Sequence, residues 1–349
     1  MKNLFTLLVC AMTAVAVYGQ TNAGRFSVSA TQQVTFAPGN LQFHMVDSVW
    51  RFADTQLDWL GNANLEVGNP NYNGWVDLFC WSIGAENNFG ATSNYDTAMC
   101  INKEFVDWGT LFDDDWYTLS KDEWNYLFNT RAGANDKWGM AKVGDTLGVI
   151  LLPDEWTAPE GITFVPRVLP TSELWDEGDL IDESWDHFRV HNENMPANLF
   201  SEDEWAQMEA AGALFLPNAG RRSGGYGNYL NRVCDTVNFM YRYSYYENYL
   251  GTYWTSTPYK IDEGKIMYVY ISIKALGDEE YDWGKIACWG ETGRYGQSVR
   301  LAKRVAVDPT ALESTTNDPS SLIRKVVRNG QFYILREGKT FTPTGQEVR

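Results

Sequence analysis

Two stretches of the sequence share the pattern Ser-x-Asp-Glu-Trp, in which paired acidic residues directly precede a tryptophan, a composition that suits acid–base chemistry or sugar binding. They are LSKDEWNYL, which begins at Leu119, and FSEDEWAQM, which begins at Phe200. Duplicated carboxylates could exchange protons with a substrate in a shared cleft, and duplicated tryptophans could stack on sugar rings. The same residue types also start helices, so the spacing has to decide between these interpretations.

The spacing in both stretches is that of a capping box, in which a serine and a glutamate three residues later bind the first free backbone amides of a helix. Ser120 and Glu123 form one such pair, and Ser201 and Glu204 form the other. An apolar residue precedes each serine and a tryptophan follows each glutamate, as in a hydrophobic staple. Gly212 then suits a left-handed helix C-cap. We therefore expect two helix starts, and a structural rather than a catalytic role for both glutamates.

Residues 1–19 have the composition of a secretory signal peptide. Lys2 precedes the uncharged run LFTLLVCAMTAVAV, and the small residues Val17 and Gly19 suit a cleavage site. This run is too short to cross a bilayer comfortably, and no later run is long enough, so we expect no membrane span. The mature protein, starting at Gln20, is expected to be secreted or held at the outer cell surface.

Composition limits the partners further. The 349 residues carry a formal net charge of −17, which repels nucleic acid and anionic membrane surfaces, so we expect neither as a partner. Aromatic residues make up 15% of the chain, which suits either glycan stacking or the core of a β-rich fold. For any single tryptophan, the core is the favoured interpretation.

Four cysteines follow the signal segment: Cys80, Cys100, Cys234 and Cys288. An oxidising compartment permits disulfides between them, and three pairings are possible. Proximity in the sequence favours Cys80 with Cys100 and Cys234 with Cys288. The absence of a CxxC spacing argues against a zinc knuckle or a redox motif.

Short β-branched and aromatic runs separated by turn residues predict an α+β domain with antiparallel sheet over residues 20–307. Strands are expected within residues 34–43 (broken by a turn at Pro38-Gly39-Asn40), 49–53, 149–152, 213–217, 253–258, 266–274 and 298–307. Residues 308–321 have the composition of a linker. Residues 322–349 are expected to form a small basic β-hairpin module, because Asn329-Gly330 joins two alternating apolar runs.

A resemblance emerges from the order of these pieces. The series runs VTFAPGNLQF, WRFADTQLDWLG, GWVDLFCWSIG, LSKDEWNYLFNTR, GVILLPDEW, FSEDEWAQMEAAGALFLPNAGRR, YWTSTPY and SVRLAKRV, from about Val34 to Val305. It resembles exported Bacteroidota proteins related to the Fibrobacter succinogenes major paralogous domain. That resemblance implies a C-type-lectin-like fold, which also houses the sulfatase-modifying, formylglycine-generating enzymes. The end of the chain resembles the short C-terminal segments of type IX secretion cargo.

Oxidative enzymes of this fold have recognisable metal-binding residues. Formylglycine formation uses two nearby cysteines that bind copper, whereas Cys234 and Cys288 are well separated and lack a matching motif. Sulfoxide-synthase relatives use a three-histidine iron site, but His44, His187 and His191 show no pattern that places them together. We expect no metal, no cofactor and no catalytic site.

The best candidate binding segment runs from Ala219 to Trp254, because arginine and tyrosine are enriched at binding hot spots. Its candidate ligand contacts are Arg221, Arg222, Tyr226, Tyr229, Tyr245 and Tyr246. In lectin-like folds the corresponding long loop carries ligand contacts, so the resemblance points to the same segment. Trp254 precedes a strand and is expected in the core.

The sequence thus predicts an exported, non-catalytic binding module that contacts a glycan or a surface protein. The alternatives are a structural or adhesin subunit and, less favoured, an oxidative enzyme of the formylglycine-generating type. Neither the ligand nor the oligomeric state follows from the sequence.

Overall fold

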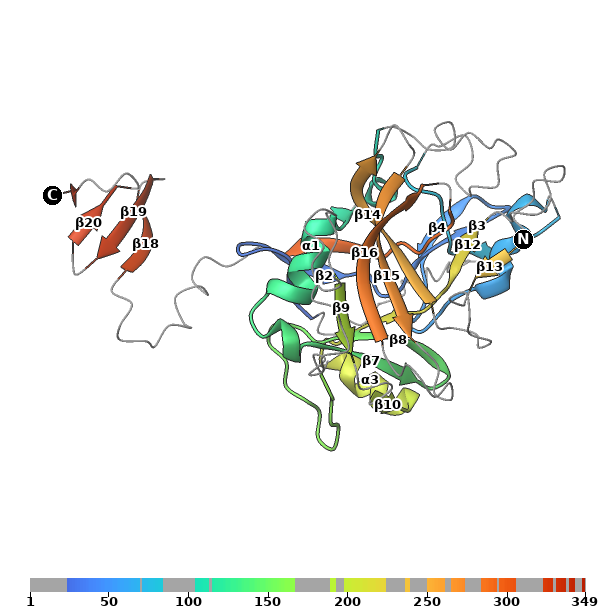
Figure 1. The fold of residues 1–349 in the computed structure, drawn as a ribbon, viewed down its shortest axis with the longest axis horizontal. Helices are drawn as coiled ribbons and strands as arrows, with labels where there is room; N and C mark the ends of the chain where they lie inside the picture. The colour runs from blue at the N-terminus through green and yellow to red at the C-terminus, as the bar shows by residue number, and fades with distance from the viewer. Residues whose placement is uncertain are drawn as a thin grey trace, which may run out of the picture. The chain divides into compact units, whose positions relative to one another are not determined.

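The chain forms two compact units, residues 1–305 and 306–349 (Figure 1). The computed structural model describes residues 24–69, 71–83, 104–112, 115–166, 189–192, 198–223, 236–238, 250–260, 265–273, 284–293, 295–305, 323–328, 331–336, 339–342 and 347–348. The expected signal peptide and linker lie outside these ranges. Within them, every helix is too short or too polar to cross a membrane. The first unit combines mostly antiparallel sheets with short helices, which agrees with the expected α+β class.

The three longest strands of the first unit and the shorter β9 make its central sheet, in the order β14-β15-β16-β9 (Figure 1). These strands are β14 (Leu250–Lys260), β15 (Lys265–Ile273), β16 (Gly284–Thr292) and β9 (Arg189–Asn192), and all neighbours are antiparallel. Both faces of β15 are buried: Val269 and Ile271 pack in one core cluster, whereas Tyr268 and Tyr270 pack in another. Alternate side chains of β15 therefore point into two different core clusters, instead of one set facing a core and the other facing solvent.

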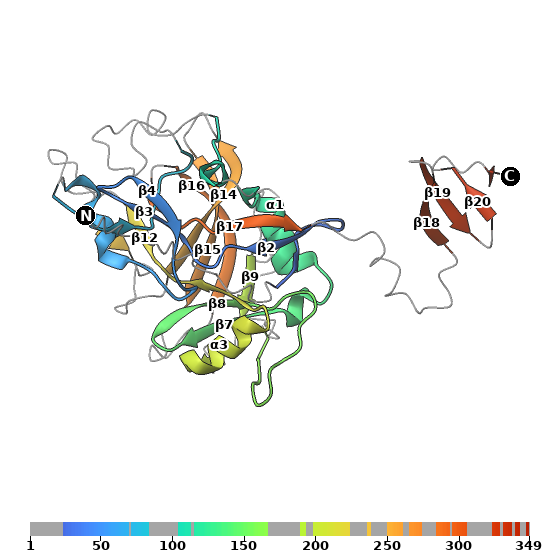
Figure 2. The same ribbon diagram turned by 180° about the vertical axis from the view of Figure 1, so that it is seen from behind.

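Two further sheets flank the central one. The first has the order β1-β2-β17-β6, and its strands are β1 (Phe26–Ser27), β2 (Gln33–Phe36), β17 (Leu301–Val305) and β6 (Trp116–Thr118). Figure 2 shows β2 beside β17. This pairing joins a strand from the start of the unit to its last strand. The second has the order β10-β7-β8-β11, and its strands are β10 (Asn198–Phe200), β7 (Trp138–Val143), β8 (Thr146–Leu151) and β11 (Leu214–Pro217).

A three-stranded sheet, β4-β3-β5, follows the predicted turn at residues 38–40. Its strands are β3 (Leu41–His44), β4 (Val49–Phe52) and β5 (Trp75–Val76). The turn does not close a hairpin, because β2 pairs with β17 whereas β3 pairs with β4 and β5. Smaller elements complete the unit: β12 (Arg221–Ser223), β13 (Thr236–Asn238) and the 3-10 helices η1 (Gly61–Gly68), η2 (Trp108–Leu111) and η4 (Ala134–Asp136).

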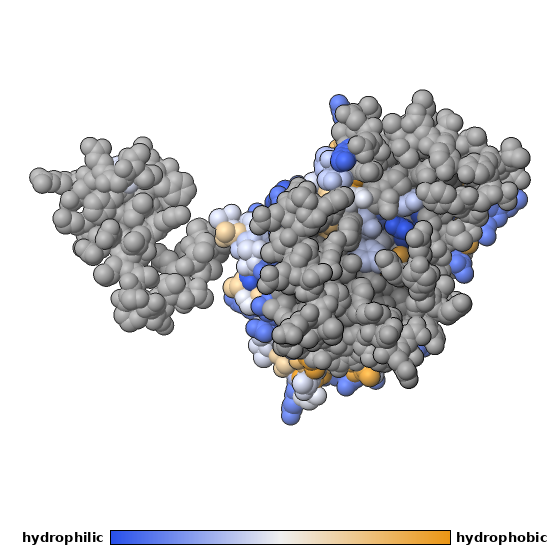
Figure 3. All heavy atoms as spheres, viewed as in Figure 1, coloured by the Kyte–Doolittle hydropathy of each residue, from blue (hydrophilic) through white to orange (hydrophobic). Residues whose placement is uncertain are grey.

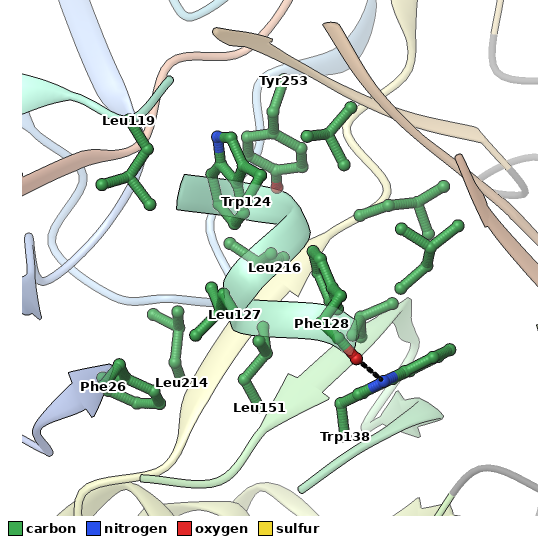
Figure 4. Close-up of a cluster of buried hydrophobic side chains, with 14 of the residues drawn as sticks. Phe26, Leu119, Trp124, Leu127, Phe128, Trp138, Leu151, Leu214, Leu216 and Tyr253 are labelled. Atoms are coloured by element: carbon green, nitrogen blue, oxygen red, sulfur yellow. Dashed lines mark hydrogen bonds between the residues drawn. The ribbon is translucent and has the colours of Figure 1, made fainter. Parts of the chain in front are cut away.

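Both predicted helix starts are present. Helix α1 (Lys121–Asn125) continues into the π-helical turn η3 (Tyr126–Thr130), and α3 covers Glu202–Ala210. Figure 4 shows Trp124, Leu127 and Phe128 on one face of the first of these, pointing into a core that Leu214, Leu216 and Tyr253 also line. Trp138 donates its indole N–H to the Phe128 carbonyl oxygen at 3.1 Å, so the end of the helical segment is tied to β7.

The second unit is an antiparallel sheet of four strands, whereas the sequence suggested a β-hairpin module with a second turn at Glu337-Gly338-Lys339. The strands are β18 (Ile323–Arg328), β19 (Gln331–Arg336), β20 (Lys339–Phe341) and β21 (Glu347–Val348), in chain order. Arg328 pairs with Gln331, so the expected two-residue connection at Asn329-Gly330 is confirmed. A second two-residue connection joins Arg336 to Lys339.

Candidate functional site

The first acidic pair is held by a helix N-terminus. The Ser120 backbone N–H donates to Glu123 Oε2 at 2.8 Å, and the Ser120 hydroxyl oxygen accepts from the Glu123 backbone N–H at 3.3 Å. The Tyr117 hydroxyl donates to the second carboxylate oxygen, Glu123 Oε1, at 2.9 Å. Burial raises the pKa of Tyr117, so this hydroxyl keeps its proton and remains a donor. Both oxygens of Glu123 are therefore engaged, and the predicted capping box is confirmed.

The second acidic pair repeats this arrangement on α3. The Ser201 N–H donates to Glu204 Oε2 at 2.8 Å, and the Ser201 hydroxyl oxygen accepts from the Glu204 N–H at 3.2 Å. The hydrogen bond from the Ser201 backbone holds the pKa of Glu204 below its usual value. Gly212 has φ of 95°, which confirms the left-handed position after the helix. This second capping box is confirmed as well.

The two capped helices serve different cores. Trp124 packs in the cluster around Tyr253, whereas Trp205 packs with Phe200 and Phe215 in a separate cluster. Each tryptophan is buried, so neither offers a ring face to a sugar. The repeated motif thus builds two separate helix starts and does not assemble the carboxylates into a shared cleft.

The arginines of the Ala219–Trp254 segment differ in their surroundings. Arg221 is half-buried, and its guanidinium lies 4.8 Å from the centre of the Tyr295 ring. Arg222 is only 1% exposed, and its Nη1 donates to the Asn64 carbonyl oxygen at 3.3 Å. This corrects the expectation that Arg222 contacts a ligand at the surface, because the buried guanidinium bonds to the backbone of η1.

Trp254 belongs to the core, as predicted. Its side chain is buried, and its indole N–H donates to the Phe79 carbonyl oxygen at 2.7 Å. The other candidate contacts of the segment, Tyr226, Tyr229, Tyr245 and Tyr246, lie outside the described residues. Their role in binding stays a prediction.

Cysteines and histidines could provide metal ligands. Cys80 and Cys288 are buried, whereas Cys100 and Cys234 fall outside the described ranges, so both expected disulfides stay predictions. In the part of the chain that the structure describes, no group of three or more His, Cys, Asp or Glu residues could hold a metal ion. His44 Nδ1 lies 3.0 Å from Asp47 Oδ2.

The outward face of the β4-β3-β5 sheet carries a cluster that the sequence did not reveal. His44 pairs with Val49 on one side and with Trp75 on the other, so these three residues form a row across the sheet. The Arg51 guanidinium lies 3.9 Å from the centre of the Trp75 ring, and the His44 ring lies 4.9 Å from it. Arg51 Nε also donates to Gln42 Oε1 at 3.0 Å, which fixes the guanidinium over the indole.

Exposed apolar residues gather at the same place. Among the described residues, four large apolar side chains are exposed, and two of them, Val46 at 57% and Val49 at 49%, lie in the β3–β4 hairpin. The described residues visible in Figure 3 are mostly hydrophilic, with apolar ones at the lower edge of the view. We call the set His44, Val46, Val49, Arg51 and Trp75 the Trp75 face. These residues belong to the three strands of this sheet and to the turn between β3 and β4, and Val46 and Val49 are the exposed ones.

The sequence indicates only some of the residues that form this face. The alternation in VWRFA places Val49 and Arg51 on the same side of a strand. Nothing local indicates that Trp75 joins them, because its strand pairs with β3 from beyond η1.

A buried polar network lies behind this sheet. Asp77 is fully buried, and its carboxylate accepts from Asn64 Nδ2 at 2.7 Å and from the Leu60 N–H at 2.9 Å. The Asn64 side-chain oxygen in turn accepts from the backbone N–H groups of Asp77 and Leu78, both at 2.9 Å. Burial raises the pKa of Asp77 to about 6, although these hydrogen bonds and the Arg222 charge act in the opposite direction. The network fixes η1 against β5.

The chain matches none of the protein-family models, curated proteins or solved structures with which it was compared. The functional conclusion therefore depends on the residues of this chain. Of the groups described above, the Trp75 face combines surface exposure with side chains suited to recognition, whereas the capping glutamates and Arg222 are engaged in internal bonds.

Proposed function

We propose that the protein is an exported, non-catalytic binding module that contacts a partner protein at the cell surface through the Trp75 face. The observation that carries this proposal is the Arg51–Trp75 stack on the sheet whose β3–β4 hairpin exposes Val46 and Val49. Arginine and tryptophan are the residue types most enriched at interface hot spots. Export is supported by the signal-like composition of residues 1–19.

A protein partner suits this face better than a glycan. A sugar ring stacks on an aromatic ring whose face is open, but one face of Trp75 lies against the Arg51 guanidinium. Val46 and Val49 add aliphatic surface, which gains most from contact with apolar side chains of another protein. The stack is also fixed before binding by the Arg51–Gln42 hydrogen bond, so little side-chain freedom remains to be lost.

Site-specific photo-crosslinking tests this proposal on intact cells. A benzoylphenylalanine placed at position 49 should give a discrete covalent adduct with one protein, identified by mass spectrometry. Trp75→Ala in the same chain should abolish the adduct, because the indole forms the centre of the contact. Arg304→Ala provides the matched control, since Arg304 stacks on Tyr117 at 4.1 Å on a different sheet. That variant should leave the adduct unchanged.

A glycan array tests the alternative that the protein binds a glycan. The wild type should bind no glycan through this face, so Trp75→Ala should leave the array pattern unaltered. Glycan binding that is lost on Tyr245→Ala with Tyr246→Ala, together with no crosslink from position 49, would refute the proposal in favour of the tyrosine segment. Bound copper or iron that disappears on mutation of Cys234 or His191 would instead favour the oxidative enzyme.

A further inference from the structure

A second feature of the first unit lies inside it, along the edge of β14 away from β15. Two segments line this edge: Gly220 forms a bridge with Gly251, and Ser298 forms a parallel bridge with Tyr253. Bridged residues point to the same side, so the Ser298 hydroxyl lies on the Tyr253 side of β14. Residue 251 points to that side as well, because side chains alternate along a strand.

Asn218 extends to the same side. A Cβ atom added to Gly251 would lie 2.7 Å from Asn218 Oδ1, so glycine at this position leaves room for the amide. The Tyr253 hydroxyl donates to the Pro217 carbonyl oxygen at 2.7 Å, which brings the residue before Asn218 to the end of the tyrosine ring. Burial raises the pKa of Tyr253, so the hydroxyl stays protonated.

Asn40 and Arg300 complete this polar interior. Both lie close enough to the Tyr253 hydroxyl to counteract the effect of burial on its pKa. Arg300 Nε donates to Asn40 Oδ1 at 3.0 Å, and its Nη1 and Nη2 donate to the carbonyl oxygens of Ala37 and Phe215. The Asn40 amide orientation follows from this bond, because a flipped amide would set two donors against each other.

Three polar atoms in this interior have no hydrogen-bond partner among the described residues: both side-chain atoms of Asn218, and Ser298 Oγ. Their residues are 1% exposed or less, so bulk solvent does not reach them. Buried polar atoms in folded proteins are almost always paired with protein or with bound water.

The chemistry of these three atoms indicates which kind of molecule could bind to them. An anion would need donors alone and a cation would need acceptors alone, but this set contains an amide donor, an amide acceptor and a hydroxyl that can act as either. The one nearby guanidinium already has three acceptors. A small neutral molecule that both donates and accepts fits the set, and water is the smallest.

We propose that Asn218 and Ser298 form an internal binding site for ordered water beside β14, in which at least one molecule joins two segments distant in the sequence. Internal waters of this kind make about three hydrogen bonds each to otherwise unpaired buried groups. The site would hold β17 and the segment after β11 to the edge of the central sheet. It is independent of the Trp75 face.

A crystal structure of the full chain at high resolution tests the site directly. We expect solvent density within about 3.2 Å of Asn218 and Ser298, a distance typical of hydrogen bonds. Water-relaxation dispersion should also detect fewer long-lived internal waters in Asn218→Leu and in Ser298→Ala than in the wild type. Thr31→Ala, which removes a hydroxyl at an exposed position, is the matched control and should show the wild-type number.

Two outcomes would overturn the site. One is a wild-type interior without solvent density, in which the Asn218 amide bonds directly to protein atoms. The other is density whose coordination distances or anomalous signal identify an ion. Because the wild-type density decides the matter alone, a variant that fails to fold leaves the test intact.

Discussion

Replacing Asp77 with asparagine should change how the stability of the first unit depends on pH. The carboxyl group is fully enclosed, and burial raises its pKa from the ordinary value of 3.8 to about 6. Between these pH values the folded chain holds a proton that the unfolded chain releases. The stability from this proton is therefore fully present below pH 3.8 and is lost as the pH rises through about 6.

The size of the effect follows from the interval between the two pKa values. It corresponds to about 3 kcal/mol, because each pKa unit is worth about 1.4 kcal/mol. Asparagine cannot titrate. Its amide would also place an N–H group beside the Leu60 and Asn64 N–H groups, which in the wild type donate to the Asp77 carboxylate. That mismatch destabilises the variant equally at every pH. It therefore changes the difference in free energy of unfolding between wild type and variant by a constant, and it does not alter how that difference depends on pH.

Urea denaturation of the wild type and Asp77→Asn at a series of pH values measures this slope. The free energy of unfolding of the wild type, minus that of the variant, should fall by about 3 kcal/mol between about pH 4 and pH 7. Carbon NMR of the folded chain should show the Asp77 carboxyl titrating near pH 6, and Arg222→Met should move that midpoint upward. A constant difference, or one that grows with pH, would refute the reasoning.

The remaining predictions concern stability at neutral pH. Ser120→Ala and Ser201→Ala should each lower the free energy of unfolding by about 1 kcal/mol in urea denaturation, because each removes a helix cap. Arg300→Met should lower it by at least about 3 kcal/mol, since three buried acceptors lose their donor at about 1 to 3 kcal/mol each; wild-type stability would show that those bonds contribute little. Gly212→Ala should cost about 1 kcal/mol in the same assay, because alanine is strained at a positive φ.

Features that depend on neighbours in the sequence were predictable. The capping boxes at Ser120 and Ser201 use residues three positions apart, and the connection at Asn329-Gly330 depends on two residues alone. The alternating strand at β15 also follows from local pattern, although its alternation divides two cores. Such features form because backbone geometry fixes which nearby side chains can meet.

Features that depend on distant partners were not predictable. Asp154, in the loop after β8, accepts hydrogen bonds from Ser27 at 2.6 Å and Gln33 at 2.8 Å and pairs with Arg131 at 3.3 Å. No local pattern marks these contacts, because they join the first strands to the loop after β8. The Arg51–Trp75 stack and the acceptors of Arg300 escaped prediction for the same reason.

The buried charges of the first unit favour a scaffold over a reaction centre. Strongly shifted pKa values often mark active sites, and burial lowers the pKa of both Arg131 and Arg300 to about 10. Each guanidinium, however, donates mainly to backbone carbonyl oxygens, among them Leu127 and Leu152 for Arg131 and Ala37 and Phe215 for Arg300. A catalytic cation must turn its donors toward a substrate, whereas these donors are already committed to joining strands and loops. The shifted pKa values thus follow from the way this β-rich unit ties its segments together, which agrees with a rigid module that presents a binding face.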